Sequence, residues 1–325
     1  MRFDIAYGAD AVYMAGTRFG MRAAATNFDD KALREGIAYA HAHGVKCYIT
    51  VNIMPSNRDL PALPAYLELL ADAGADALII ADVGVLRMAR KYAPSVPVHI
   101  STQTSILNHE AANFWAEEGA ERIVLARELS LEEIAEIRAK TPKELEIEAF
   151  VHGAMCISYS GRCLISQYMT GRDANHGACA QPCRWNYSLM EEKRPGQFFP
   201  VEEDGRGTYL YNSKDMCMIE HVPELIEAGI TSFKIEGRNK TAYYAACVTG
   251  AYRAAIDTYK KDPENFVLPQ FCRDEVNKVS HREYYTGFYF GNQENGQHYG
   301  DSQYIREYEV VGMPVECDDS GKAVF

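Results

Sequence analysis

Residues 73–82 read AGADALIIAD: a glycine, a short apolar run, and an acidic residue where the run stops. Four other segments also have a glycine followed by a short apolar run, at residues 7–16, 43–52, 118–128 and 228–238. A glycine just past a helix supplies the left-handed C′ position, so each copy indicates a helix that ends and a strand that begins. Helix and strand alternating in this way predict parallel βαβ units.

Two further apolar runs, at residues 98–105 and 145–153, lack the glycine but have the same strand character. Polar residues stand where the runs end: Asn52, Asp82, Gln103, Arg127, His152, and Glu236 with Arg238. The strands of a (β/α)8 barrel converge with their carboxyl ends at one mouth, where active sites are built. No GxGxxG motif follows any strand, so a dinucleotide-binding doubly wound sheet is not supported. The α/β pattern therefore favours a TIM-like (β/α)8 barrel.

The barrel is predicted to lack its first strand, because only seven strands are found and a helical stretch alone precedes residues 7–16. We assign residues 1–262 to the barrel domain. If the missing strand is counted as the first, residues 145–153 form strand seven. An insertion over about residues 153–228 follows this strand, and a helix is expected at the end of the insertion, from Ser213 to Ala228. Residues 263–325 are expected to form a C-terminal extension, the start of a truncated β-rich domain. Its last residues, 308–325, read as a hairpin around an Asp-Ser-Gly turn.

Composition describes an ordinary globular protein, with 47% hydrophobic and 24% charged residues. No apolar run approaches the length of a membrane span and no export signal opens the chain, so we expect a cytoplasmic protein without a membrane partner. An odd number of cysteines, nine, argues for reduced thiols, metal ligation or catalysis rather than disulfides. The net charge of −12 opposes general nucleic-acid binding, although a locally basic groove is compatible with it.

Four of the cysteines cluster in a turn-rich segment with the spacing Cys-x6-Cys-x15-Cys-x3-Cys: Cys156, Cys163, Cys179 and Cys183. Structural zinc sites usually have two short Cys-x2-4-Cys pairs, and only the last two cysteines match that pattern. A radical-SAM triplet is excluded because position 186 is Asn186. One short pair with irregular spacing is compatible with a [4Fe-4S] cluster held by thiolates from several loops. Cys47 and Cys247 lie in strand and helix patterns and are predicted to be core residues.

The residues around the thiols leave several roles open. His152 and His176 are candidate bases for a cysteine hydrolase, which needs a Cys–His pair. The arginines near the thiols, Arg162, Arg172 and Arg184, are candidates for binding an RNA phosphate or a dicarboxylate, or are solvated loop charges. Trp185 either stacks on a base or anchors the core, the latter being favoured. Lys234, Glu236 and Arg238 form either a charged cluster at the mouth or a structural ion pair; Glu236 and Arg238, with His152, are the candidate catalytic residues.

Residues 148–166, EAFVHGAMCISYSGRCLIS, closely resemble the signature of the collagenase-like peptidase family U32. Residues 8–16, 99–105, 212–229 and 232–240 also look like segments of that family, so the resemblance runs from about residue 5 to 260. Despite the family's name, better-understood members act in hydroxylation and carry an oxygen-sensitive [4Fe-4S] cluster. One branch helps to convert the wobble uridine of tRNA to 5-hydroxyuridine and requires prephenate. Others hydroxylate a ribosomal-RNA cytidine or support anaerobic ubiquinone synthesis.

The resemblance implies cluster ligands at Cys156, Cys163 and Cys179. The fourth ligand is expected at Cys183 by proximity, with Cys217 as the alternate. It also implies tRNA or another RNA as partner, prephenate as a co-substrate, and a homologous partner subunit. Two alternatives to hydroxylation stay open at this point. One is a collagenase-like protease, and the other is a non-catalytic protein that binds or assembles an iron–sulfur cluster.

Overall fold

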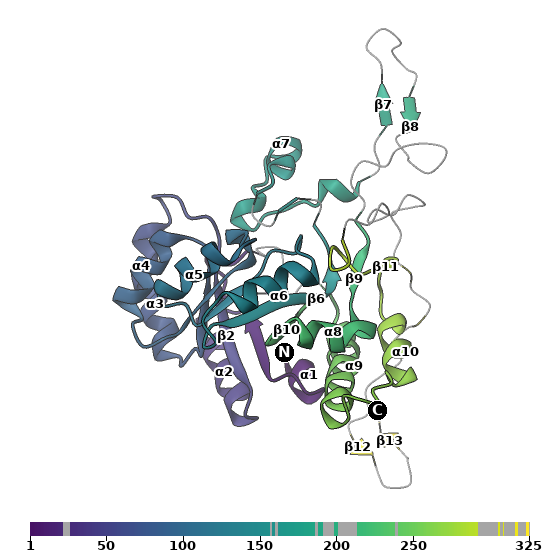
Figure 1. Cartoon of the computed structure of the whole chain (residues 1–325). Helices are drawn as coiled ribbons and strands as arrows, with labels where there is room; N and C mark the ends of the chain where they lie inside the picture. Colours follow the sequence, from purple (N-terminus) through teal and green to yellow (C-terminus); the bar gives the residue numbers. More distant parts are fainter. Residues whose placement is uncertain are drawn as a thin grey trace.

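The computed structural model describes residues 1–21, 27–156, 158–159, 162–185, 188–190, 198–200, 213–237, 240–291, 305, 308, 316–317 and 323–324. Within them, a nine-stranded sheet forms the centre of the molecule (Figure 1). Its seven parallel strands are β1 (Ala11–Met14), β2 (Lys46–Val51), β3 (Ala77–Ile80), β4 (Val98–Ile100), β5 (Arg122–Val124), β6 (Glu146–Ala154) and β10 (Ser232–Glu236). They pair in chain order from β1 to β6, and β10 then pairs with the other edge of β6.

Helices link the parallel strands and cover the outer face of the sheet (Figure 1). They are α1 (Arg2–Ala6), α2 (Asp30–Ala42), α3 (Leu63–Asp72), α4 (Val83–Tyr92), α5 (His109–Glu117), α6 (Leu131–Ala139), α8 (Val222–Glu227) and α9 (Ala242–Lys261). Short 3-10 turns lie at Leu60–Ala62 (η1), Thr102–Thr104 (η2), Ala174–His176 (η3), Pro182–Arg184 (η4) and Ile219–His221 (η5). No helix in the described part of the chain is both long and apolar enough to cross a membrane. The predicted α/β alternation is confirmed.

The helix boundaries follow from local sequence chemistry. Polar N-cap side chains accept hydrogen bonds from free backbone amides at the starts of α2, α4, α5, α6 and α9; the caps are Asp29, Asp82, Asn108, Ser130 and Thr241. Glycines with a positive φ stand at the predicted positions before the strands, namely Gly8, Gly44, Gly74, Gly119 and Gly229. The repeated Gly-strand pattern therefore marks glycines at the C′ positions of helices, as predicted.

Alternation along the strands sorts side chains onto two faces. Ile49 of β2 and Leu78 of β3 belong to the large core that the helices cover. Their neighbours Tyr48 and Ile79 belong instead to a small cluster on the inner face. The two end strands also approach each other across this inner face, because the Lys234 ammonium of β10 lies 4.6 Å from the centroid of the Tyr13 ring of β1. The sheet therefore curls around a shared interior.

Closure of the sheet differs from an eight-stranded barrel. In the described residues β1 pairs only with β2, and β10 pairs only with β6, so no hydrogen-bonded ladder joins the two edges. What the structure confirms is an α/β fold with a mostly parallel sheet, and the closed barrel stays a prediction.

The segment between β6 and β10 holds α7 (Ile165–Thr170), β7 (Ser188–Met190), β8 (Phe198–Pro200) and β9 (Asp215–Cys217). β7 and β8 pair with each other, and β9 pairs antiparallel with the end of β6. The helix predicted from Ser213 to Ala228 is wrong in its first half, which is β9 followed by η5. Pro223 is tolerated only in the first helical turn, so α8 begins beside it.

After α9 the chain continues into α10 (Gln270–Lys278), β11 (Tyr284–Tyr285), β12 (Glu316–Cys317) and β13 (Ala323–Val324). Cys272 and Val276 of α10 belong to the main core, and β11 pairs with β9. β12 and β13 pair antiparallel, which confirms the predicted hairpin near the end of the chain. The proposed division at residue 262 stays a prediction.

Candidate functional site

A cavity of about 820 Å³ lies on the inner face of the sheet. Six of the seven parallel strands contribute to its wall, through Tyr13, Thr50, Ile79, Val124, Phe150 and Lys234, and Ser101 lines it directly after the end of β4. Further lining residues come from the loops at the carboxyl ends of the strands and from the start of α9. This volume suits a small-molecule or nucleotide-sized ligand, and the carboxyl-end location is where parallel α/β sheets place their sites.

The cysteine-rich segment forms part of the wall of the same cavity. Cys156, Cys163, Cys179 and Cys183 all line it. Hydrogen bonds hold this segment to the loop after β2, since the amide of Met54 donates to the carbonyl oxygen of Asn175 at 3.1 Å. Four thiols separated by up to 27 positions in the chain are thus brought to one space.

The chemistry of this donor set suits a thiolate-bound cluster, because soft sulfur ligands select iron–sulfur, zinc or Cu(I) sites. Among the described side chains, no group of three or more His, Cys, Asp or Glu is already gathered tightly enough to hold a metal ion. The four cysteines therefore have the donor chemistry that a cluster needs, and they line one cavity. Among the described side chains, however, their sulfur atoms are not gathered into a set that would hold a metal ion. Cys217 is placed differently: it lies on β9, does not line the cavity, and burial raises the pKa of its thiol to about 11.

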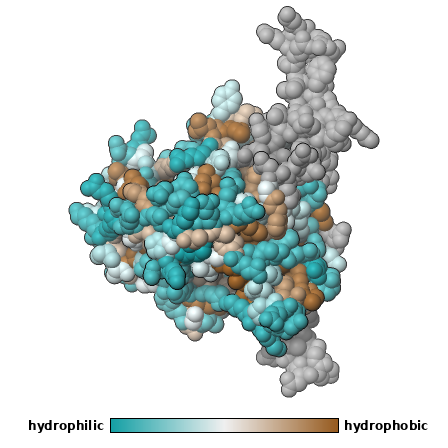
Figure 2. Space-filling model, viewed as in Figure 1, coloured by the Kyte–Doolittle hydropathy of each residue, from teal (hydrophilic) through white to brown (hydrophobic). Residues whose placement is uncertain are grey.

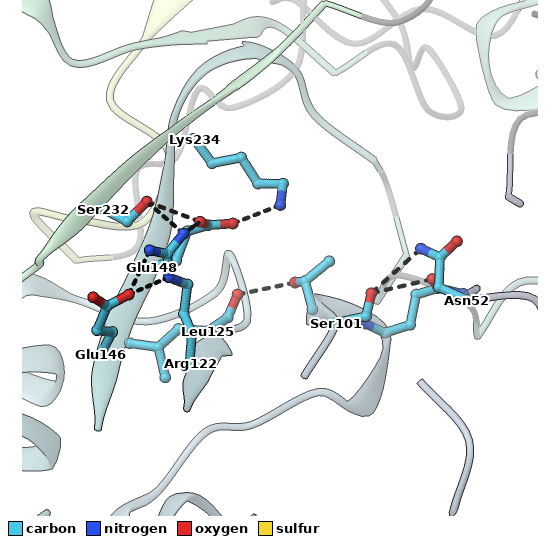
Figure 3. Close-up of polar contacts among 10 residues, drawn as sticks. Asn52, Ser101, Arg122, Leu125, Glu146, Glu148, Ser232 and Lys234 are labelled. Carbon is cyan, nitrogen blue, oxygen red and sulfur yellow. Dashed lines mark hydrogen bonds and ion pairs between the residues drawn. The ribbon is translucent and has the colours of Figure 1, made fainter. Parts of the chain in front are cut away.

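A buried charged network supports the cavity floor (Figure 3). Glu148 of β6 accepts a hydrogen bond from the Lys234 ammonium at 2.5 Å and another from Ser232 at 2.8 Å. Arg122 of β5 donates to Glu148 at 3.0 Å and, through Nε, to Glu146 at 2.6 Å. Burial alone would raise the pKa of Glu148, but Lys234 and Arg122 outweigh it and hold the pKa at about 2. The network is therefore charged at neutral pH, and it fixes the Lys234 side chain beside the cavity.

Arg127, where β5 ends, is a second cation in the cavity wall. Its guanidinium lies 3.8 Å from the centroid of the Phe150 ring and donates to the carbonyl oxygen of Ala154 at 2.9 Å. These contacts hold the cation flat against β6. The wall thus combines cationic and aromatic surfaces, with Tyr243 and Tyr244 of α9 adding two more rings.

A group of uncharged polar side chains lines the part of the cavity at the ends of β2 and β4. The Asn52 amide donates to Ser101 Oγ at 3.5 Å (Figure 3). Ser101 Oγ in turn donates to Gln103 Oε1 at 3.2 Å. Ser101 and Gln103 are only 3% and 4% exposed, so these are amide and hydroxyl groups buried against a cavity. Such placement is typical of groups that fix the orientation of a ligand.

A sequence model of peptidase family U32 matches residues 1–299. The chain belongs to peptidase family U32. It is 41% identical to tRNA hydroxylation protein P1 of Bacillus subtilis (strain 168), over 100% of this chain and 76% of that protein. It is 39% identical to the 23S rRNA 5-hydroxycytidine C2501 synthase of Escherichia coli (strain K12), over 97% of this chain and 46% of the relative. An uncharacterized protease of Methanocaldococcus jannaschii is 42% identical, over 89% of this chain and 70% of the relative.

This U32 chain keeps His152 outside the cavity. The ring is 1% exposed and packs against Tyr244, Tyr252 and Tyr284, with the Tyr284 hydroxyl 3.3 Å from Nε2. Burial lowers the pKa of His152 to about 3, so the ring is neutral. His176 also lies off the cavity lining and forms a hydrogen bond with Asp173 at 2.8 Å. A base role for either histidine stays a prediction, and neither shares the cavity with the thiols.

The other predicted site residues are distributed as follows. Glu236 lines the cavity at the end of β10, where Gly153 of β6 lets the strands come close: a Cβ on Gly153 would lie 2.7 Å from the Glu236 carbonyl oxygen. Arg238 and the side chain of Arg184 lie outside the described residues. Arg162 and Arg172 are exposed and do not line the cavity.

The surface of the U32 insertion is unusually apolar around α7. Figure 2 shows a hydrophobic patch over this helix, where Leu164 is 69% and Met169 is 45% exposed. Trp185 is also 45% exposed, so the favoured prediction that it anchors the core is wrong. By contrast, Cys47 and Cys247 are buried as predicted.

Sequence reasoning missed two parts of the site. Glu148 is not among the predicted site residues, although a carboxylate inside an apolar strand is itself a signal of a buried ion pair. Lys240, Tyr243 and Lys278 line the cavity from the start of α9 and the end of α10. Nothing local in the sequence shows that α10 approaches the mouth, because that contact is set by packing of α10 on α9.

Proposed function

We propose that this chain takes part in iron–sulfur-dependent hydroxylation of RNA, at C5 of a pyrimidine base. The uridine at the wobble position of tRNA is the proposed substrate. The observation that carries the proposal is the sharing of one cavity by the four clustered cysteines and the polar strand ends. The names of the bacterial relatives, which refer to tRNA hydroxylation and to 5-hydroxycytidine synthesis, support the same reaction class.

A [4Fe-4S] cluster is proposed to be held by Cys156, Cys163, Cys179 and Cys183. When bound, such a cluster would supply one-electron redox chemistry at the cavity. Cys183 is preferred over Cys217 as the fourth ligand for two reasons. It lines the cavity with the other three, and the partly buried Cys217 thiol has a raised pKa that disfavours the thiolate a ligand must supply.

RNA is proposed to approach over the insertion. Proteins read single-stranded loops by stacking splayed bases on aromatic side chains and by pairing phosphates with arginine. Tyr168 is 88% exposed and Trp185 is 45% exposed, close in sequence to the exposed Arg162 and Arg172. These groups give the acidic chain a local surface suited to RNA. Prephenate, as a proposed co-substrate, is a dicarboxylate that the cationic wall near Arg127 would attract.

Four broader features of the protein are also proposed. A closed (β/α)8 barrel is supported by one cavity that is lined by residues on six of the parallel strands and by Ser101, directly after β4. Assignment of the chain to the cytoplasm, its division near residue 262 and a homologous partner subunit rest on the sequence and on the family resemblance.

The protease alternative requires an activated nucleophile with a base within hydrogen-bond reach. Among the described residues that line the cavity there is no histidine, while four thiols exceed what a one-cysteine hydrolase uses. Hydroxylation is therefore the function that the site supports best.

The test is mass spectrometry of tRNA and rRNA nucleosides from a strain that lacks the gene. Loss of a hydroxylated pyrimidine that the wild-type gene restores is the expected result, and the RNA fraction that loses it identifies the substrate. Unchanged RNA, together with cleavage of gelatin by the purified protein after removal of iron, would reinstate the protease. Unchanged RNA without proteolysis, but with a stable cluster, would favour a non-catalytic role.

A further inference from the structure

Gln103 is a buried uncharged polar side chain in the cavity wall with an open hydrogen-bond donor. It lies in η2, directly after β4, and is 4% exposed. Its Nε2 atom is fully buried and has no hydrogen-bond partner among the described residues. A buried amide nitrogen without an acceptor is rare in folded proteins, and such atoms commonly mark a site for a ligand or an ordered water. The cavity is the space that can supply one.

The neighbouring hydrogen bonds fix which end of the Gln103 amide is engaged and which end is left without a partner. The backbone amide of Met21 donates to Asn52 Oδ1 at 3.3 Å, and Asn52 Nδ2 donates to Ser101 Oγ at 3.5 Å. Ser101 Oγ also accepts from the Gln103 backbone amide at 3.4 Å, so its own hydrogen goes to Gln103 Oε1 at 3.2 Å. In this series of hydrogen bonds the Gln103 Oε1 atom accepts from Ser101, and the Gln103 Nε2 donor is left without an acceptor among the described residues. The complementary ligand atom must therefore be an acceptor.

The rest of the wall restricts the kind of acceptor. Aromatic rings of Tyr13, Phe150 and Tyr244 line the same cavity, as do the cysteines. Flat aromatic surfaces with one fixed amide donor suit a planar heterocycle that carries a carbonyl oxygen. Glutamine and asparagine amides are also the side chains that read base edges in nucleic-acid complexes.

We propose that Gln103 is a specificity-determining residue, whose Nε2 donates to a carbonyl oxygen of the pyrimidine base held in the cavity. This inference rests on the proposed function and names the residue that would read the substrate base. Uracil and cytosine both carry the O2 carbonyl, and uracil carries O4 in addition. If the amide binds the base through O2 or O4, it does not cover C5, so C5 stays open to reaction.

The first experiment uses variants of the whole chain in the deletion strain, read by nucleoside mass spectrometry. Gln103→Glu replaces the donor by an acceptor, and Gln103→Met keeps the length of the side chain without a donor. Both are expected to restore less than about a tenth of the hydroxylated pyrimidine that the wild type restores. Gln270→Glu makes the same chemical change at an exposed position off the cavity lining and is expected to restore all of it. Restoration above half by both Gln103 variants would overturn the inference.

The second experiment leaves the protein unchanged, so a folding defect cannot explain its result. Anaerobically purified wild-type protein is titrated with an anticodon stem–loop RNA that has uridine, 2-thiouridine or 4-thiouridine at the wobble position. Sulfur is a weak acceptor, so one of the two thio substitutions is expected to weaken binding by at least about threefold. Equal binding of the three RNAs, or binding of none, would overturn the inference. Failure of the proposed function is separate, since the deletion strain would then keep every hydroxylated pyrimidine.

Discussion

Replacement of Glu148 by Gln should destabilise the protein by about 3 kcal/mol at neutral pH. The carboxylate lies in the buried network with Lys234 and Arg122, and its pKa is about 2 against an ordinary 4.5. Each pKa unit corresponds to about 1.4 kcal/mol, which gives the magnitude, and loss of one partner from a buried ion pair usually costs about 3–5 kcal/mol. Glutamine preserves the shape of the side chain, so the change removes charge with little change in packing.

The same pKa shift fixes how this difference depends on pH. A carboxylate whose pKa is lowered by folding stabilises the protein fully above its unfolded pKa, near 4.5, and the stabilisation is lost as the pH falls toward 2. Wild type and Glu148→Gln should therefore differ most at pH 7. Their free energies of unfolding should converge as the pH is lowered from 4.5 toward 2.

The measurement is urea unfolding followed by circular dichroism, at pH 7 and again at pH 3. Glu146→Gln is the matched control, because Glu146 pairs with the same arginine from the same strand but is 48% exposed. An exposed pair contributes about 0–1 kcal/mol, so this variant should lose less than 1 kcal/mol. Equal losses for the two variants, or a Glu148→Gln loss that is unchanged at pH 3, would refute the reasoning.

Two further predictions concern the cysteines and His152. Cys183→Ala should abolish retention of iron and sulfide after anaerobic purification, whereas Cys217→Ala should leave most of the cluster; the reverse result would move the fourth ligand to β9. His152→Phe should keep more than half of the wild-type hydroxylated pyrimidine in the complemented strain, because the ring lies outside the cavity. Loss of a general base costs about 10²–10⁴-fold, so a decrease of that size would return His152 to catalysis.

The sequence predicts the parallel sheet well because its signals are local. Each glycine before a strand acts through its own backbone conformation, and Gly74 has the positive φ that the pattern requires. The shared position of the cysteines could also be anticipated, since a family signature marks the loop after a strand. The burial of the Glu148 side chain and the contribution of Lys278 to the cavity wall could not be anticipated, because both depend on how elements distant in the sequence pack together. The prediction that Trp185 anchors the core was wrong for a related reason. A large aromatic side chain is usually buried, and only the fold shows that this one is exposed.

RNA hydroxylation is proposed to depend on the cavity that the clustered cysteines line. Two cysteine-to-alanine variants test it most directly, compared in the deletion strain by nucleoside mass spectrometry. Cys163 lines the cavity, while Cys247 is buried in α9 outside it. Cys163→Ala should leave the hydroxylated pyrimidine absent, and Cys247→Ala should restore it to the wild-type level. Full restoration by Cys163→Ala, at a normal amount of folded protein, would contradict the account.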